Sequence, residues 1–292
     1  MSVEKVLFPT RFRELSFNSL ESLLVLKDAG MKEIILCHVI SREDVGFVPF
    51  GGYMQEEEDN LREEARIRFE DWQRSISEKG IESKIVIRVG DIVPQILHVA
   101  EEEKVDMIVL GKKKEEHPFA GSKTFEIMTR SRIPALVSKY MVHYMIGTES
   151  HEKINEKIFE RPMLVTDWSE PSGRALDFMV SLAGIINKSL IFHDVDVNIS
   201  KDHDKEELHL VEKQSSAKLD DFCKKLNDAG IDAEPHLGAG EVVDEIIRIS
   251  RERHATMIII GTTAKGWLSE LVKGSVSHQV AKDSELPTLL VP

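Results

Sequence analysis

The chain has 292 residues, which is the length of about two ordinary domains. Its 41% hydrophobic and 30% charged residues are typical of a soluble globular protein, and its net charge of −13 argues against a protein that holds nucleic acid on a basic surface. No apolar run reaches the roughly 18 residues of a membrane span and the start is unlike a signal peptide, so we expect no membrane partner.

Short apolar segments alternate with segments of helical period along the first 138 residues. Continuous apolar runs of this length are typical of strands that are buried on both faces of a parallel sheet. The predicted strands are residues 5–8, 33–40, 83–89, 106–111 and 134–138. The predicted helices are residues 16–29, 57–79, 91–104 and 121–132.

The second half repeats this alternation. Its predicted strands are residues 163–166, 189–195, 232–237, 256–261 and 287–292. Its predicted helices are residues 171–187, 206–229, 241–254 and 274–284. Asp91 and Glu241 follow glycines at equivalent helix starts, where we expect their carboxylates to cap free N–H groups.

The two halves share one sequence frame, which marks a duplicated domain. Residues 90–111 align with 240–261, and Trp72 aligns with Phe222. Five β–α units in each half imply a doubly wound α/β sheet. We therefore predict one domain over 1–138, a partly helical linker over 139–160, which has no counterpart, and a second domain over 161–292.

The loop after the fourth strand of the second half is a candidate anion site. Ligands of doubly wound sheets bind beyond the carboxyl ends of the strands. Here Gly261 ends the strand, and Gly274-Ser275 opens a helix whose free N–H groups suit phosphate. Ser277 adds a second hydroxyl. Gly-Ser before a helix is equally typical of a plain cap, so the residues alone leave both interpretations open.

Residues 261–277, together with MLVTDWSE (163–170) and LPTLLVP (286–292), resemble the universal stress protein family. The resemblance covers both halves. It implies two five-stranded parallel sheets of strand order 3-2-1-4-5, each an α/β domain. Family members commonly dimerise through the fifth strands, so we expect the two halves to form that pair internally, as an intramolecular pseudo-dimer. A further homodimer is left open.

Nucleotide-binding members of the family carry glycine, two residues, glycine, nine residues and Gly-Ser or Gly-Thr in this loop, with an Asp after the first strand. The resemblance implies that Asp167 contacts a ribose and that backbone at Asp194 contacts a base. Ala264 replaces the second glycine, and Gly266 provides the nearest alternative flexibility. The implied nucleotide-binding residues are Thr166, Asp167, Asp194, Gly261, Ala264, Gly266, Gly274, Ser275, Val276 and Ser277. Without the family, Asp167 is typical of an N-cap or an Asx turn.

The first half departs from the motif at each of these positions. Arg11 stands where the second half has Asp167, and Lys114 stands where the second glycine belongs. The loop between Gly111 and Gly121 holds 9 residues, against 12 between Gly261 and Gly274. We therefore predict a degenerate first half, whose Lys112–Lys114 belong to a solvated loop.

Several polar and aromatic residues favour a structural role over a chemical one. His38 and His193 end the second strand of each half, which indicates a role in the fold. Trp168 is predicted to pack, with shielding of a nucleotide base as the alternative, and the aromatic segment 41–56 is also predicted to pack. His203 and His209 lie among acidic residues, which is typical of a solvated helix start more than of a metal site. Cys37 and Cys223 do not correspond, so no disulfide framework is expected, and a reducing cytoplasm is favoured.

The sequence holds no H-E-x-x-H, G-x-S-x-G, Walker lysine or C-x-x-C motif. The resemblance therefore favours an adenine-nucleotide-binding stress-response regulator or sensor, which takes ATP or AMP, alone or with Mg²⁺ or Mn²⁺, in the second half. One alternative is an interaction scaffold that binds no nucleotide, and another is a slow ATP hydrolase. A relative of flavoproteins or ATP-consuming ligases would share the sheet, but no second catalytic module is present.

Overall fold

The computed structural model describes residues 2–12, 16–45, 55–111, 122–139, 141–146, 149–154, 157–196, 205–262 and 275–292. In the first half, the strands are β1 (Lys5–Pro9), β2 (Glu33–Ile40), β3 (Glu82–Val89), β4 (Met107–Gly111) and β5 (Ala135–Ser138). Its helices are α1 (Ser16–Glu21), the 3-10 helix η1 (Leu24–Ala29), α2 (Gln55–Glu78), α3 (Ile92–Glu102) and α4 (Lys123–Arg130).

In the second half, the strands are β8 (Pro162–Val165), β9 (Lys188–Asp196), β10 (Asp232–Gly240), β11 (Met257–Gly261) and β12 (Thr288–Val291). Its helices are α5 (Glu170–Ser181), α7 (Lys205–Asp228), α8 (Val242–Glu252) and α9 (Val276–Asp283). Within the described residues, no helix is both long and apolar enough to cross a membrane.

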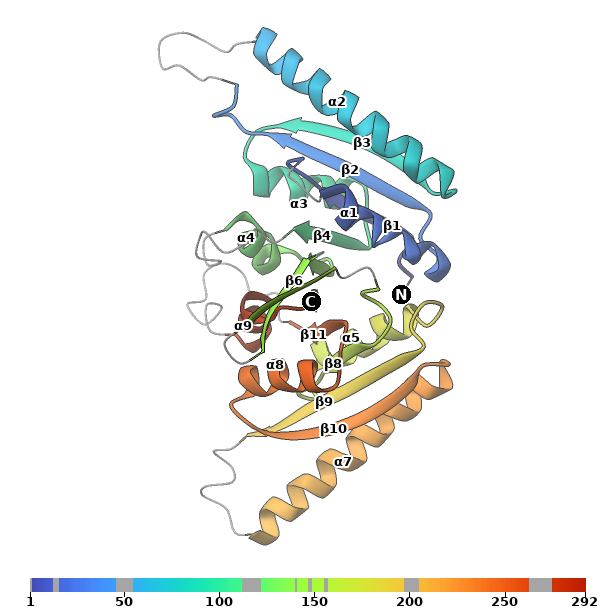
Figure 1. The fold of residues 1–292 in the computed structure, drawn as a ribbon, viewed down its shortest axis with the longest axis vertical. Helices are drawn as coiled ribbons and strands as arrows, with labels where there is room; N and C mark the ends of the chain where they lie inside the picture. Colours follow the sequence, from blue (N-terminus) through green and yellow to red (C-terminus); the bar gives the residue numbers. More distant parts are fainter. Residues whose placement is uncertain are drawn as a thin grey trace.

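All ten of these strands form one continuous sheet (Figure 1). Its order is β10-β9-β8-β11-β12-β5-β4-β1-β2-β3, so each half has the predicted order 3-2-1-4-5. Pairing is parallel within each half and antiparallel between β5 and β12, where Leu289 lies opposite Leu136. The predicted α/β class and the pairing of the fifth strands are confirmed.

Helices cover both faces of the sheet, and each core runs through both halves. One core packs α1, η1, α2, α5 and α7 against the sheet, and the other packs α3, α4, α8 and α9. Side chains alternate between the two cores along a strand: Val6 and Phe8 face the first, and Leu7 faces the second. Burying each such side chain stabilises the fold by about 1.5–3 kcal/mol.

Two helix predictions need correction. The helix predicted over 16–29 is a short α-helix followed by η1. The Ser22 hydroxyl donates to the Ser19 carbonyl at 2.8 Å, which competes with continued α-helical hydrogen bonding. Asp91 and Glu241 occupy N-cap positions, but neither side chain accepts a capping hydrogen bond. Both are exposed, so water can satisfy these helix starts.

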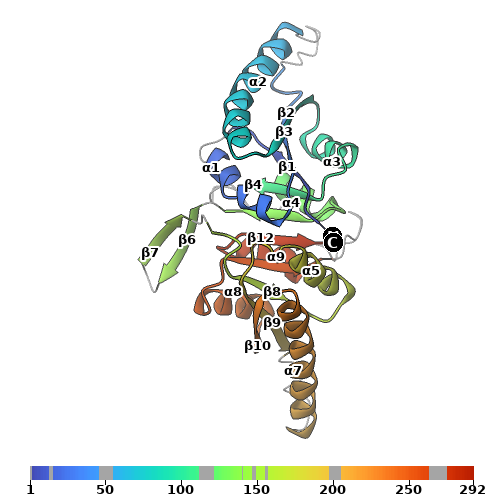
Figure 2. The ribbon, with the colours of Figure 1, turned by 90° about the vertical axis from the view of Figure 1, so that its right-hand side faces the viewer.

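The segment between the halves contains a β-hairpin, so the prediction of a partly helical linker is wrong. Strands β6 (Met141–Ile146) and β7 (Glu149–Ile154) pair antiparallel, with Ile146 opposite Glu149. The β-branched and aromatic content of residues 141–146 favours a strand, and the sequence leaves only Gly147-Thr148 between the paired residues. The hairpin projects from the side of the molecule (Figure 2).

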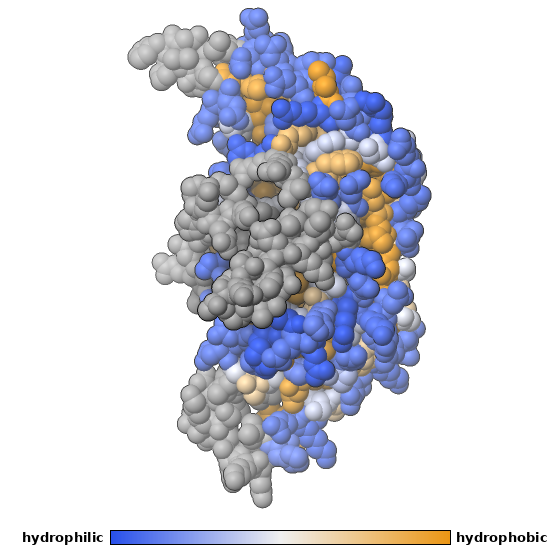
Figure 3. Space-filling model, viewed as in Figure 1, coloured by the Kyte–Doolittle hydropathy of each residue, from blue (hydrophilic) through white to orange (hydrophobic). Residues whose placement is uncertain are grey.

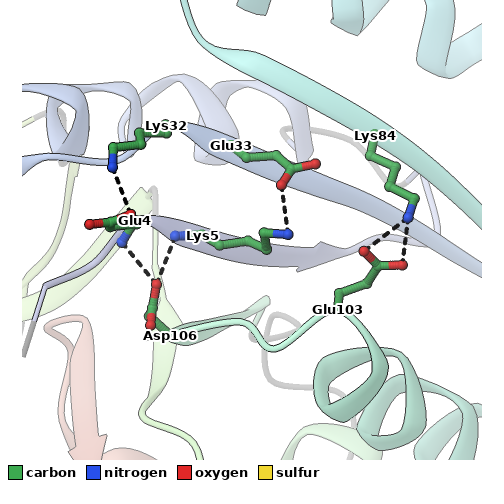
Figure 4. Close-up of polar contacts among 7 residues, drawn as sticks. All are labelled: Glu4, Lys5, Lys32, Glu33, Lys84, Glu103 and Asp106. Carbon is green, nitrogen blue, oxygen red and sulfur yellow. Dashed lines mark hydrogen bonds and ion pairs between the residues drawn. The ribbon is translucent and has the colours of Figure 1, made fainter.

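Polar contacts join the amino ends of the strands in the first half (Figure 4). The Asp106 carboxylate accepts the backbone N–H groups of Glu4 and Lys5 at 2.9 and 2.8 Å. The ion pairs around it are Lys32–Glu4, Lys5–Glu33 and Lys84–Glu103. All three pairs lie at the surface, where solvent screens the attraction between the charges, so they contribute little to stability. This edge is opposite the one where the predicted site lies.

Candidate functional site

The predicted site residues gather at one edge of the sheet, where three neighbouring strands of the second half end. Strand β8 pairs in parallel with both β9 and β11, so the carboxyl ends of the three strands lie together. The residues that the structure places there are Thr166, Asp167, Asp194, Gly261, Ser275, Val276 and Ser277. Ala264, Gly266 and Gly274 lie outside the described residues, as do Lys112–Lys114 and most of the aromatic segment 41–56.

Asp167 follows β8 in an Asx turn. Its Oδ1 accepts the Ser169 N–H at 3.0 Å and the hydroxyls of Ser169 and Ser172, each at 2.5 Å. Burial alone would raise the pKa of Asp167, but the hydrogen bonds from the two serines outweigh it and lower the pKa. The carboxylate is therefore ionised at neutral pH, and all of its described hydrogen bonds go to Oδ1.

A threonine and an aromatic residue shape the turn after the first strand in both halves. The Trp168 N–H donates to Thr166 Oγ1 at 3.1 Å, and the Phe12 N–H donates to Thr10 Oγ1 at 2.9 Å. Both aromatic residues have positive φ, 65° for Trp168 and 52° for Phe12. This left-handed turn was not predicted, although the pattern Thr-x-aromatic occurs at the equivalent place in each half. It presents residue 167 outward at the strand end.

His193 supports this turn from the neighbouring strand. Its Nδ1 lies 2.8 Å from the Thr166 carbonyl oxygen, and its Nε2 lies 3.1 Å from Trp168 Nε1. Since the indole N–H can only donate, Nε2 is the acceptor and the proton is on Nδ1. Burial lowers the pKa of His193, which keeps the ring neutral. His38 makes the same contact with the Thr10 carbonyl at 2.8 Å, so the predicted role in the fold holds for both residues.

Trp168 packs, as predicted. Its ring lies 4.4 Å from the His193 ring and 5.3 Å from the Phe222 ring, between centroids. Lys218 Nζ lies 5.5 Å from its centroid. Asp194 is next to His193 on β9, and because strand side chains alternate, the two project to opposite faces of the sheet. A Cβ built at Gly238 would be 3.2 Å from Asp194 Oδ1, which places that carboxylate over β10.

Gly261 allows the end of β11 to approach the start of α5. A Cβ at this position would lie 2.4 Å from the carbonyl carbon of Pro171 and 2.5 Å from the Ser172 nitrogen. The matching Gly111 has no heavy atom within 4 Å of such a Cβ. Close packing therefore requires glycine at position 261 in the second half. This packing places Ser172, and with it Asp167, close to the end of β11.

The first turn of α9 carries a chain of hydroxyl groups. Ser277 is buried and its Oγ donates to Thr262 Oγ1 at 3.2 Å. Ser275 Oγ lies 3.4 Å from Ser277 Oγ and also contacts Nδ1 of His278, a buried residue that was not singled out from the sequence. The pattern Ser-x-x-His at a helix start could have identified it, since residues i and i+3 share a helix face.

The two halves differ in how the serine at this helix start is used. In the first half, Ser122 Oγ accepts the Phe125 N–H at 3.1 Å and caps α4. In the second half, Ser275 occupies the N-cap of α9 but its side chain accepts no capping hydrogen bond. The equivalent of Phe125 is His278, and the two rings meet between the halves with centroids 5.7 Å apart.

The described residues contain no preformed metal site. Among them, no group of three or more His, Cys, Asp and Glu side chains could hold an ion. His209 is exposed on α7, and His203 lies outside the described residues. Both cysteines are buried and unbonded, and burial raises the pKa of Cys37 to about 12 and that of Cys223 to about 11.

Comparison with known proteins shows a separate match for each half of the chain. The sequence model of the universal stress protein family matches residues 2–139 and again residues 159–292. Universal stress protein MJ0577 of Methanocaldococcus jannaschii is 29% identical over 153 residues, which are 47% of this chain and 94% of the relative. Universal stress protein YxiE of Bacillus subtilis is 29% identical over 147 residues, 46% of this chain and 99% of the relative.

Solved structures match the whole chain as well. A universal stress protein from Archaeoglobus fulgidus superposes with a TM-score of 0.74 at 23% identity, and covers 99% of this chain and 96% of its own. One from Pseudomonas aeruginosa UCBPP-PA14 superposes with a TM-score of 0.62 at 13% identity, over 99% of this chain and 93% of its own. At these identities the similarity establishes the fold, including the tandem arrangement.

Proposed function

The chain belongs to the universal stress protein family, and we propose that its second half, residues 161–292, binds one adenine nucleotide, ATP or AMP, as a stress-response regulator or sensor. One contrast between the halves carries the proposal. The second half combines Asp167 with an uncapped start of α9 at the same edge of the sheet. The first half has Arg11 and an α4 that is capped by Ser122.

Each part of this edge suits one part of a nucleotide. Asp167 is ionised, and Oδ2 is available to accept ribose hydroxyl protons while Ser169 and Ser172 hold Oδ1. The N–H groups in the first turn of α9, at Val276 and Ser277, would donate to a phosphate bound at the positive end of the helix. A Mg²⁺ or Mn²⁺ ion would be held mainly by the phosphates, since such ions in nucleotide sites often use few protein ligands.

Isothermal titration with AMP and ATP tests this function. We expect about one site per chain. Asp167→Ala should weaken binding about tenfold or more, because hydrogen bonds to a charged group contribute roughly 1.5–3 kcal/mol. The matched control is Arg11→Ala in the first half, which should leave the affinity unchanged.

The other outcomes separate the alternatives. Two sites per chain would contradict a degenerate first half. Absence of binding would favour the interaction scaffold, for which Ala264 in place of the second motif glycine is the supporting feature. Release of inorganic phosphate from bound ATP over hours would favour the slow hydrolase instead.

A further inference from the structure

His278 occupies an unusual place for a polar side chain. It lies in the first turn of α9, is 4% exposed, and packs against Phe125 of the other half. Its Nδ1 contacts Ser275 Oγ, whereas its Nε2 is buried and has no hydrogen-bond partner among the described residues. Burial lowers the pKa of His278, so the ring is neutral at pH 7.

Because Nε2 of His278 has no hydrogen-bond partner among the described residues, the proton of the neutral ring is expected on Nδ1. A neutral imidazole has one N–H donor and one acceptor. A proton on Nε2 would leave a buried donor without an acceptor, which is costly. A proton on Nδ1 would instead be used in the hydrogen bond to Ser275 Oγ. The geometry thus favours His278 as the donor and the Ser275 hydroxyl oxygen as the acceptor.

This direction releases the hydroxyl proton of Ser275 from His278. Ser277 Oγ, which donates its own proton to Thr262, lies 3.4 Å from Ser275 Oγ, and a contact of that length holds the Ser275 proton only weakly against a phosphate oxygen. A serine hydroxyl has a single proton, so a serine that donates it to a histidine cannot also donate it to a ligand. We propose that His278 is a positioning residue, which donates to Ser275 Oγ and so directs the Ser275 hydroxyl proton toward a phosphate bound at the start of α9. The inference rests on the proposed nucleotide site.

The same assignment separates this pair from a nucleophilic Ser–His pair. A general base must offer an unprotonated nitrogen to the serine hydroxyl. Here the nitrogen that faces Ser275 carries the proton, so His278 holds the hydroxyl in place and does not activate it. The first half, with Phe125 at the equivalent position, has no such donor, and there Ser122 accepts from the helix backbone.

A double-mutant cycle on the full chain tests the inference, with AMP and adenosine as ligands in isothermal titration. His278→Phe, which installs the residue of the first half, should weaken AMP binding about tenfold. Adenosine binding should change less than twofold, because adenosine has no phosphate. In a Ser275→Ala background, adding His278→Phe should cost less than a further twofold, since the histidine acts through the serine.

His278→Asn guards against a purely structural effect. The asparagine amide can donate where Nδ1 does, so this variant should retain AMP affinity within about threefold. Thermal midpoints of all variants should be measured alongside. A wild-type chain without affinity for AMP overturns both the proposed function and this inference. Wild-type binding with no loss in His278→Phe, equal losses for AMP and adenosine, or additive losses in the double variant overturns this inference alone.

Discussion

At the residue scale, comparison of equivalent positions in the two halves shows which side chains serve the common fold and which give one half its own chemistry. The turn after the first strand places Phe12 against Trp72 in the first half, with centroids 5.6 Å apart. In the second half, Trp168 packs against Phe222 at 5.3 Å. The large and the smaller aromatic ring have exchanged places, which keeps the total core volume. Such pairs belong to the fold, whereas the exchange of Arg11 for Asp167 changes the chemistry.

A pair of glycines gives a test of close packing at this scale. Gly261→Ala should destabilise the protein by about 1–3 kcal/mol, because its Cβ would overlap the backbone of Pro171 and Ser172. Gly111→Ala is the matched control and should change stability by less than about 0.5 kcal/mol. Urea denaturation measures both. Equal effects would show that the contact at the start of α5 relaxes freely.

Histidine burial predicts that stability depends on pH. Burial lowers the pKa of four histidines below the ordinary value in the folded chain: His38, His193, His236 and His278. Below a pH of about 6.5 the unfolded chain binds protons at these residues while the folded chain does not, so stability falls as pH falls toward the folded pKa values. Above that pH the four histidines are neutral in both the unfolded and the folded chain, so their titration no longer lowers the stability.

Thermal unfolding at pH 7.5, 6.5 and 5.5 measures this dependence. We expect the thermal midpoint of the wild type to be lower at pH 5.5 than at pH 7.5. In the His278→Phe variant the same change of pH should lower the midpoint by a smaller amount, since one of the four histidines is gone. His98→Gln is the control, because that side chain is exposed on α3. A midpoint that rises on acidification would contradict the assignment of neutral, buried rings.

At the element scale, the central strands of the sheet are those that end each half. Strands β5 and β12 are fully buried, and each pairs with its own half and with the other strand. The outer edges are β3 and β10, which carry charged residues such as Lys84 and Arg88 and, on β10, Pro235. Charges and proline discourage pairing with other molecules, so the sheet stops growing there.

Truncation of β12 tests its central place. Deleting residues 288–292 should expose the edges of β5 and β11 together and cause both halves to aggregate or unfold. Size-exclusion chromatography and circular dichroism measure the result. Leu289→Val is the control, since loss of one buried methylene costs only about 0.5–1.5 kcal/mol and leaves the pairing in place. A truncated chain that stays monomeric and folded would refute this role.

At the scale of the whole molecule, the two halves form one body around a local two-fold axis (Figure 1). Contacts besides the strand pair join them. A Cβ at Gly184 would lie 2.7 Å from the Asp28 carbonyl oxygen, and the Lys139 ammonium donates to the Ser284 carbonyl. Much of the described surface in Figure 3 is hydrophilic, as the net charge of −13 leads one to expect. Most buried apolar side chains lie in the two cores on either face of the sheet, and Figure 3 shows smaller hydrophobic areas on its right-hand side.

The symmetry of the pairing between β5 and β12 predicts how an isolated half behaves. A fragment of residues 161–292 should form a homodimer through β12, because a second copy can replace β5 across the same axis. Sedimentation equilibrium measures this, with Leu289→Lys in the fragment as a control that should remain monomeric. A wild-type fragment that stays monomeric at high concentration would mean that the edge is satisfied in another way.

The sequence by itself determined the ten strands of the large sheet and most of the helices between them, because the apolar periodicity of each segment and the repeat of that pattern are local properties. The residues alone favoured an Asx turn or N-cap at Asp167 and left a plain cap open at Ser275. Their roles toward a nucleotide came from the family resemblance and stay predictions. The pairing of β5 with β12 could be expected from the duplication and the family resemblance together. The hairpin could not, because in residues 139–160 the repeat offers no second copy for comparison.

Only the tertiary structure decided what surrounds each site residue. The hydrogen bonds that occupy one oxygen of Asp167, the overlap that a side chain at Gly261 would create, and the contact of His278 with Phe125 all join segments distant in sequence or depend on the conformation of a turn. The same Gly-Ser step caps a helix in one half and leaves it open in the other. In the second half, the Ser275 hydroxyl contacts His278, and the His278 ring packs against Phe125 of the first half, so these neighbours are seen only in the folded molecule.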